Sequence, residues 1–169
     1  MTRAIRFEHA STLPVPVGRL WQFHVRPDAL ALLTPPFPPV RQLDRGDGVA
    51  DGSIVRLRLG LGPLGHDWTA LHTGVRTGHS FTDIALESPF PCWVHLHSFE
   101  ELTRATSRLT DVVVVVPPSW LPGRLGRTLL RFALRRLFAW RHARTRTLLV
   151  GRPRRPGLPC HRLAPAPSA

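Results

Sequence analysis

The chain has 169 residues, of which 43% are hydrophobic and 20% charged, which is enough for one domain with an apolar core and excludes a wholly disordered chain. Two cysteines are too few for a disulfide-stapled secreted module, and the first ten residues contain no apolar stretch typical of a signal peptide, so we expect a cytoplasmic protein. The net charge of +12 arises in residues 112–169, which hold arginines and no acid, whereas arginines and acids balance before them.

The first expected element is a half-buried strand over about residues 5–11, where apolar and charged side chains alternate. Two short helices are expected over about 17–24 and 29–33, because apolar residues recur there at spacings of three and four. The proline-rich segment 34–39 cannot continue a helix, since proline lacks the amide donor and clashes with the preceding turn. It is therefore expected to be an extended connector.

From residue 40 to 116 the sequence has β character, with turn residues between successive apolar runs. The connections are short, and parallel neighbours would need crossovers of a dozen residues or more, so an antiparallel meander is predicted. The expected strands cover about 40–46, 53–60, 65–76, 79–88, 93–102 and 107–116.

A long helix is predicted from about residue 120 or 123 to 149. On a wheel of 100° per residue it has an apolar side, expected to face the sheet, and an opposite basic side. We expect the basic, proline-rich residues 151–169 to be disordered. The apolar side holds Leu125, Leu129, Phe132, Ala133, Leu137 and Trp140, and the opposite side holds Arg124, Arg127, Arg131, Arg135 and His142.

Arg136 falls on the apolar side of this helix, between Leu125 and Leu129 on the wheel. A guanidinium that faces the interior needs an anionic partner, because burying an unpaired charge is costly. Arg136 would either pair with an acid of the sheet, such as Asp83 or Asp111, or hold a carboxylate or phosphate of a ligand.

The order strand, two helices, six strands and long helix resembles the SRPBCC superfamily of START-type and birch-pollen-allergen-like helix-grip proteins, over residues 1–150. The resemblance implies an α+β fold, in which a curved antiparallel sheet of about seven strands wraps around the C-terminal helix and leaves a cavity. It implies no single reaction, because the superfamily includes lipid carriers, hormone receptors and cyclases. The segments that resemble its bacterial polyketide cyclase/dehydrase-like branch are 13–16, 20–24, 33–36, 68, 81–83, 89–90, 93–99 and 138–142.

Strand alternation places aromatic, histidine and aspartate side chains together on the face expected to be concave. Such a face suits an apolar ligand with one or two polar groups, and it equally suits buried histidines that only satisfy the core. The candidate ligand-binding residues are Trp68, His72, Phe81, Asp83, Trp93, His95, His97, Phe99 and Arg136, and the catalytic candidates are His97, His95 and Asp83.

Metal binding is a further hypothesis for this cluster, because His95 and His97 at positions i and i+2, with His72 and Asp83 nearby, offer nitrogen and oxygen ligands. The sequence lacks the fixed cysteine or histidine spacings of established metal motifs. We therefore expect no metal and no other cofactor.

Three functions remain open. The first is binding of a hydrophobic small molecule, such as a lipid, isoprenoid or polyketide. The second is a cyclase or dehydratase in which a histidine with a pKa near neutrality removes a proton next to a carbonyl. The third is docking on an anionic membrane or on nucleic acid through the helix face formed by Arg124, Arg127, Arg131 and Arg135, with Leu134 and Phe138 beside it. Nucleic acid is the less expected partner, because arginine without lysine also fits GC-rich codon usage.

Overall fold

The computed structural model describes residues 4–44, 48–121 and 123–151, so the predicted disorder over 152–169 lies outside the described residues. Within the described part, no helix is long and apolar enough to cross a membrane. The elements in chain order are β1 (Ile5–Leu13), α1 (Val17–His24), α2 (Ala29–Leu32), β2 (Val40–Asp44), β3 (Ile54–Leu59), the short 3-10 turn η1 (Gly62–Leu64), β4 (His66–Arg76), β5 (Ser80–Glu87), β6 (Cys92–Thr103), β7 (Thr106–Val116) and α3 (Gly123–Val150).

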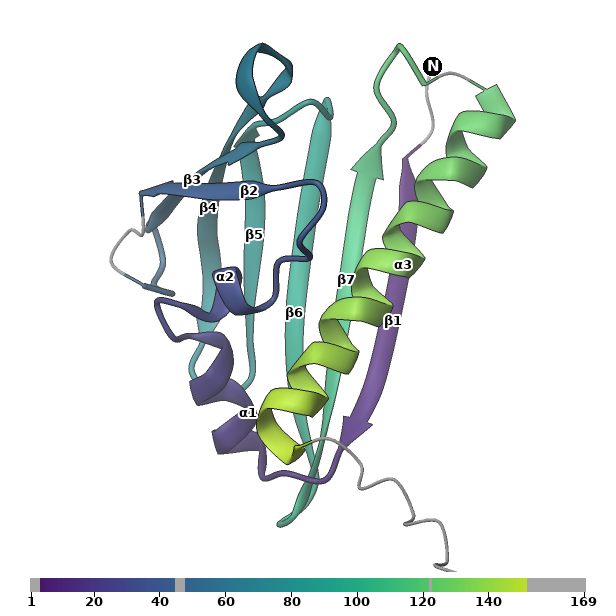
Figure 1. The fold of residues 1–169 in the computed structure, drawn as a ribbon. Helices are drawn as coiled ribbons and strands as arrows, with labels where there is room; N and C mark the ends of the chain where they lie inside the picture. Colours follow the sequence, from purple (N-terminus) through teal and green to yellow (C-terminus); the bar gives the residue numbers. More distant parts are fainter. Residues whose placement is uncertain (1–3, 45–47, 122, 152–169) are drawn as a thin grey trace, which may run out of the picture.

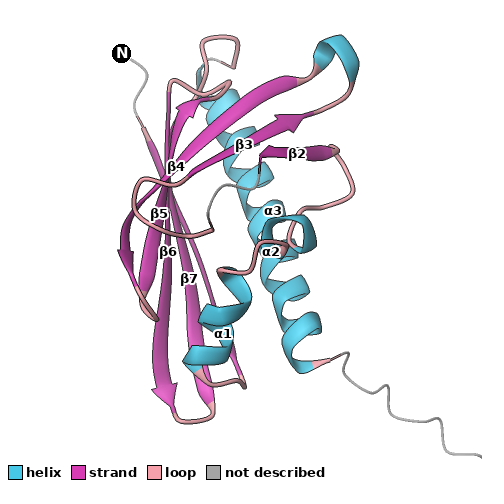
Figure 2. Ribbon diagram, turned by 90° about the vertical axis from the view of Figure 1, so that its left-hand side faces the viewer, coloured by secondary structure: helices cyan, strands magenta, loops and turns pink. Residues whose placement is uncertain are grey.

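The described strands form one antiparallel sheet in the order β1-β7-β6-β5-β4-β3-β2. The consecutive run from β2 to β7 is the meander that the short connections predict, and β1 joins it by pairing with β7. Gly78 shows how tight these connections are, because it reverses the chain between β4 and β5 with a φ of 80°, a left-handed conformation that favours glycine. Figure 1 shows α3 crossing the sheet near β1 and β7, with α1 and α2 on the other half. Figure 2 shows all three helices on one side of the sheet, with β2 and β3 curving over them.

The inward face of α3 differs from the prediction, in which Leu125, Leu129 and Phe132 faced the sheet. These three side chains are 72%, 50% and 60% exposed. Both sides of the helix carry apolar residues, and packing against β1 selects the side on which they recur every fourth position. The buried residues of α3 are Gly126, Leu130, Leu134, Phe138, His142 and Thr145.

The observed orientation of the helix also corrects the predicted placement of four other residues. Arg136 is exposed, with its guanidinium 5.8 Å from the ring centre of Phe132, so the prediction that it faces the interior is wrong. Leu134 and Phe138, expected beside the surface arginines, are buried, and so is His142. On the predicted basic face, Arg124, Arg131 and Arg135 are exposed and Arg127 is half-buried.

Two apolar clusters fill the two ends of the space between sheet and helices. The first lies against α1 and the second against α3. Along β7, Leu109 belongs to the first cluster and Val113 to the second, and the buried Asp111 lies between them. A layer of polar residues therefore separates the two clusters. The first cluster comprises Leu13, Val15, Leu20, Trp21, Phe81, Phe99 and Leu109, and the second Ile5, Val113, Val115, Leu130, Leu134 and Phe138.

The orientation of α3 predicts very different costs for two phenylalanine substitutions on the same helix. Phe138 is fully buried, so Phe138→Ala should lower the free energy of unfolding by about 3–5 kcal/mol in urea denaturation. Phe132→Ala is the matched control and should cost about 1 kcal/mol or less, because its ring is exposed. Equal losses in the two variants would contradict this orientation.

Candidate functional site

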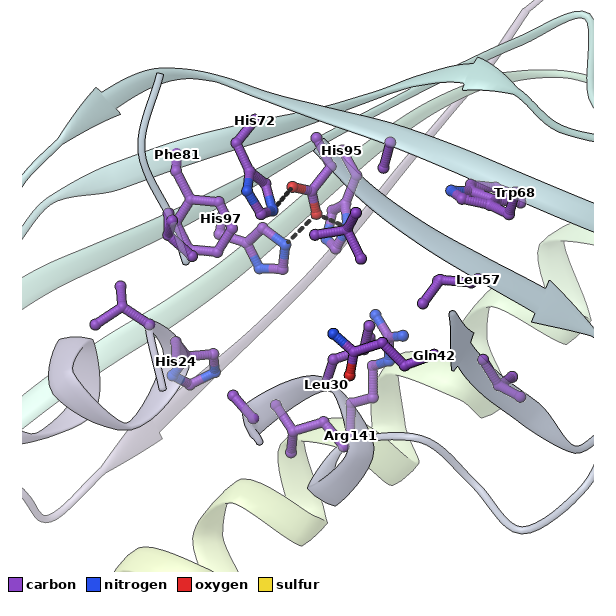
Figure 3. A pocket seen from close by; sticks show the side chains of 18 of the residues that line it. His24, Leu30, Gln42, Leu57, Trp68, His72, Phe81, His95, His97 and Arg141 are labelled. Atoms are coloured by element: carbon purple, nitrogen blue, oxygen red, sulfur yellow. Dashed lines mark hydrogen bonds and ion pairs between the residues drawn. The ribbon is translucent and has the colours of Figure 1, made fainter. Parts of the chain in front are cut away.

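A cavity of about 350 Å³ lies between the curved sheet and the helices. Its walls are mostly apolar, with Val55 and Leu57 from β3 and Leu30 from α2 among them. Figure 3 shows the histidines of the sheet on one side of this space and Arg141 rising from α3 on the other. The cavity therefore has an apolar lining with polar groups on opposite walls.

Most of the predicted ligand-binding residues lie at this cavity. Phe99 does not line it, because its ring is only 3% exposed and packs edge-to-face on Trp21 in the first apolar cluster. Arg136 is exposed on the outer surface of α3 and is also absent from the lining. The predicted residues that line the cavity are Trp68, His72, Phe81, Asp83, Trp93, His95 and His97.

Asp83 on β5 is held by histidines from both neighbouring strands. Its Oδ1 lies 3.0 Å from His72 Nε2 and its Oδ2 lies 3.1 Å from His97 Nε2, contacts that Figure 3 shows as dashed lines. His95 Nδ1 is 3.8 Å from the same Oδ2. The other nitrogen of His72, Nδ1, lies 2.9 Å from the Ser53 hydroxyl, which fixes the ring on that side.

Asp111 on β7 lies deeper and contacts three imidazoles. Its Oδ1 is 2.8 Å from both His95 Nε2 and His97 Nδ1, and its Oδ2 is 2.6 Å from His142 Nε2 on α3. His142 Nδ1 in turn lies 2.7 Å from the Ser11 hydroxyl on β1. A continuous chain of polar contacts thus crosses the molecule from Ser53, just before β3, to His142 on α3.

His97 is the cation of this network. Burial alone would lower its pKa, but the negative charges of Asp111 and Asp83 outweigh burial and raise the pKa to about 9. Burial likewise opposes ionisation of the two aspartates, yet the histidine contacts keep the pKa of each carboxyl below its ordinary value. Two carboxylates therefore enclose one imidazolium at neutral pH.

His95 stays neutral beside this cation. Burial and the nearby charge of His97 lower the pKa of His95 to about 4, although Asp111 opposes the shift. Both nitrogens of His95 and both nitrogens of His97 face aspartate oxygens. In this arrangement the imidazolium of His97 has no lone pair, and the one lone pair of neutral His95, at Nδ1, is directed toward Asp83.

The same protonation state bears on metal binding. Asp83, His95 and His97 offer ligand atoms that all lie within 4.8 Å of one another, close enough for a divalent ion. The imidazolium form of His97, however, has a proton on Nε2, and a ligand needs a lone pair there. Binding an ion would require His97 to lose a proton that Asp83 and Asp111 hold, so we propose no metal here.

Polar groups outside the network line the cavity as well. The Nδ1 of His24 donates to the carbonyl oxygen of Leu20 at 2.8 Å, and burial lowers the pKa of His24 to about 4. Its neutral ring therefore has an acceptor lone pair at Nε2. Gln42 on β2 and Arg141 on α3 complete this set.

Sequence reasoning missed the centre of the network, although signals for it exist. Asp111 occupies an inward position on a strand whose other inward positions are apolar, which marks a charged residue that needs partners. His142 follows Leu130, Leu134 and Phe138 at a spacing of four, which is the buried face of α3. Arg141 has no comparable signal, because several arginines precede and follow it on the helix.

Removing the carboxylate of Asp111 should destabilise the fold strongly. Asp111→Asn leaves the positive charge of His97 buried with one counterion, so a loss of about 3–5 kcal/mol in the free energy of unfolding is expected from urea denaturation. Asp67→Asn is the control, because it breaks an ion pair with Arg58 on the surface and should cost about 1 kcal/mol or less. A loss no larger for Asp111→Asn than for Asp67→Asn would contradict a central role for Asp111.

Stability should also fall as the pH rises above neutrality. The pKa of His97 is about 9 in the folded state and 6.5 ordinarily, so its contribution is complete below pH 6.5 and is lost as the pH rises through 9. The free energy of unfolding should decrease over this window, and the decrease should shrink in His97→Gln. His79→Gln, at an exposed histidine, should retain it. Wild-type stability that is flat or rising over this window would be inconsistent with a protonated His97.

Proteins with a similar fold occur among solved structures. No family model matches the chain, and no curated protein does. Among solved structures, a nucleoside-diphosphate sugar epimerase from Corynebacterium glutamicum is 28% identical with a TM-score of 0.63, over 83% of this chain and 28% of that one. The chain thus spans 28% of the length of that epimerase.

Two further structures match nearly over their whole length. The ZhuI aromatase/cyclase from Streptomyces sp. R1128 is 17% identical with a TM-score of 0.61, over 88% of this chain and 93% of that one. A norcoclaurine synthase from Thalictrum flavum is 13% identical with a TM-score of 0.64, over 89% of this chain and 96% of that one. The sheet order, the long C-terminal helix and these likenesses show that the chain has the helix-grip fold.

Proposed function

We propose that this chain binds a mainly apolar small molecule in the cavity between sheet and helices. The observation that supports this function is a space of about 350 Å³ lined largely by apolar and aromatic side chains, with a few polar groups on its walls. Ligand sites in proteins have this size and composition. Removing apolar ligand surface from water contributes about 25 cal/mol per Å², so burial in such a cavity supplies most of the affinity.

The names of the similar structures agree with a small-molecule site. One is an aromatase/cyclase and another a norcoclaurine synthase, and both superpose on most of this chain. The identities of 17% and 13% support the shared fold and do not transfer a reaction. Lipids, isoprenoids and polyketides all remain within the proposed ligand class.

Acid–base catalysis on such a ligand is the second candidate, and the buried histidines on the cavity wall are its support. The geometry supports catalysis less well than ligand binding without a reaction, because His97 is protonated at neutral pH and both of its nitrogens face aspartates. A general base needs an accessible lone pair. Docking through the basic helix predicts a filled interior, so the cavity favours ligand binding over that function too.

A neutral fluorescent probe tests the proposed binding. N-phenyl-1-naphthylamine should bind wild-type protein with enhanced emission, whereas Ala70→Trp should weaken binding at least about tenfold, because the indole occupies space that Ala70 leaves open. Thr69→Trp is the matched control, since its side chain lies on the opposite face of β4. It should bind the probe like the wild type.

The folding of each variant must be verified by circular dichroism, because overpacking costs about 1–3 kcal/mol. Leu57→Trp, at a second lining residue on β3, repeats the test if Ala70→Trp is unfolded. Probe binding that is unaffected in both folded variants, or no binding by the wild type, would refute the proposed function.

A further inference from the structure

Arg141 on α3 lines the cavity and has an unusual environment for an arginine. Its Nε is buried, and no described residue accepts a hydrogen bond from it. Its guanidinium carbon lies 5.6 Å from the ring centre of Phe138, which supports one face of the group. Figure 3 shows the side chain extending from α3 into the cavity. The donors of Arg141 are thus directed at the space that a ligand would occupy.

Among residues 4–44, 48–121 and 123–151, no acid forms an ion pair with this guanidinium. Asp83 and Asp111 attract it, but their oxygens contact histidines, and neither forms an ion pair with Arg141. Burial lowers the pKa of Arg141, yet the guanidinium stays charged at neutral pH. A half-buried cation whose buried Nε has no acceptor carries a desolvation cost, which an anionic group of a ligand would offset.

We propose that Arg141 binds an anionic oxygen group, a carboxylate or its sulfonate analogue, on the ligand of this cavity. The inference rests on the proposed function, because it concerns the polar end of the molecule that the cavity holds. A guanidinium presents paired donors that match the two oxygens of such a group. The ligand class is therefore narrowed to an apolar body with an acidic head group.

The positions of Arg141 and of the apolar lining define how this ligand would be oriented in the cavity. Its acidic group lies at α3, and its apolar body extends along β3 and β4, where Leu57 and Trp68 line the space. The network around Asp83 lies across the cavity from Arg141, as Figure 3 shows, so a second carboxylate on the ligand would be disfavoured there. A ligand with one acidic end is therefore preferred over a diacid.

Two probes that share one ring system test the proposal. The anionic probe is 8-anilinonaphthalene-1-sulfonate, and N-phenyl-1-naphthylamine is the same molecule without the sulfonate. The ratio of their dissociation constants in each protein reports the contribution of the anionic group. Arg141→Met should reduce the preference for the sulfonate about tenfold or more, while the affinity for the neutral probe changes less than about twofold.

Arg136→Met is the matched control, because it removes an exposed arginine from the same helix. It should leave the probe ratio unchanged, which separates cavity binding from attraction to the basic surface. Arg141→Gln, which keeps a polar side chain, should lose the preference like Arg141→Met and covers the case in which the methionine variant does not fold.

The outcomes separate this inference from the proposed function. If neither probe binds the wild type, the cavity does not hold apolar ligands and both ideas fail. If the neutral probe binds but the probe ratio is the same in the wild type and in Arg141→Met, ligand binding stands and the anion site is refuted. An equal fall in Arg136→Met also refutes it, because the sulfonate then responds to surface charge.

Discussion

One buried carboxylate connects the sheet to the long helix. Asp111 contacts His95 and His97 on β6 through one oxygen and His142 on α3 through the other. It lies between the two apolar clusters, and its partners pack on both of them, His97 on the ring of Phe81 and His95 on the ring of Phe138. Because a buried charge is tolerated only with its partners in place, this contact sets how α3 lies against the sheet.

The network around Asp111 and Asp83 leaves the cavity with polar groups on its walls, and most of the polar atoms in the network face one another. Most polar atoms of the imidazoles and the two aspartates lie close to one another, although Asp83 Oδ1 and His97 Nδ1 have no hydrogen bond, so few of their donors or acceptors face the cavity. The groups that are left come from other elements, namely Arg141 on α3, His24 on α1 and Gln42 on β2. The proposed ligand would therefore meet these groups on the helices and β2, whereas the central strands hold the network.

Arg136 and Arg141 lie on the same helix but have different surroundings, because the orientation of α3 turns one to solvent and the other to the cavity. Five residues correspond to a rotation of about 140° around the helix axis. Arg136 is therefore on the solvent side, over the exposed ring of Phe132, and Arg141 lines the cavity, beside the buried ring of Phe138. From the sequence, an anionic partner is expected for an inward guanidinium at Arg136, whereas the inward guanidinium of α3 is that of Arg141.

The sequence by itself determined the elements and the sheet. Alternation, turn residues and prolines act locally, so the strands, the short helices and the antiparallel order could be predicted to within a few residues, as could the shared face of Asp83, His95 and His97. Only the tertiary structure decided which side of α3 is buried, because both sides carry apolar residues and the sheet selects between them. That choice brings His142 to Asp111 and Arg141 to the cavity, since these contacts join residues far apart in the chain.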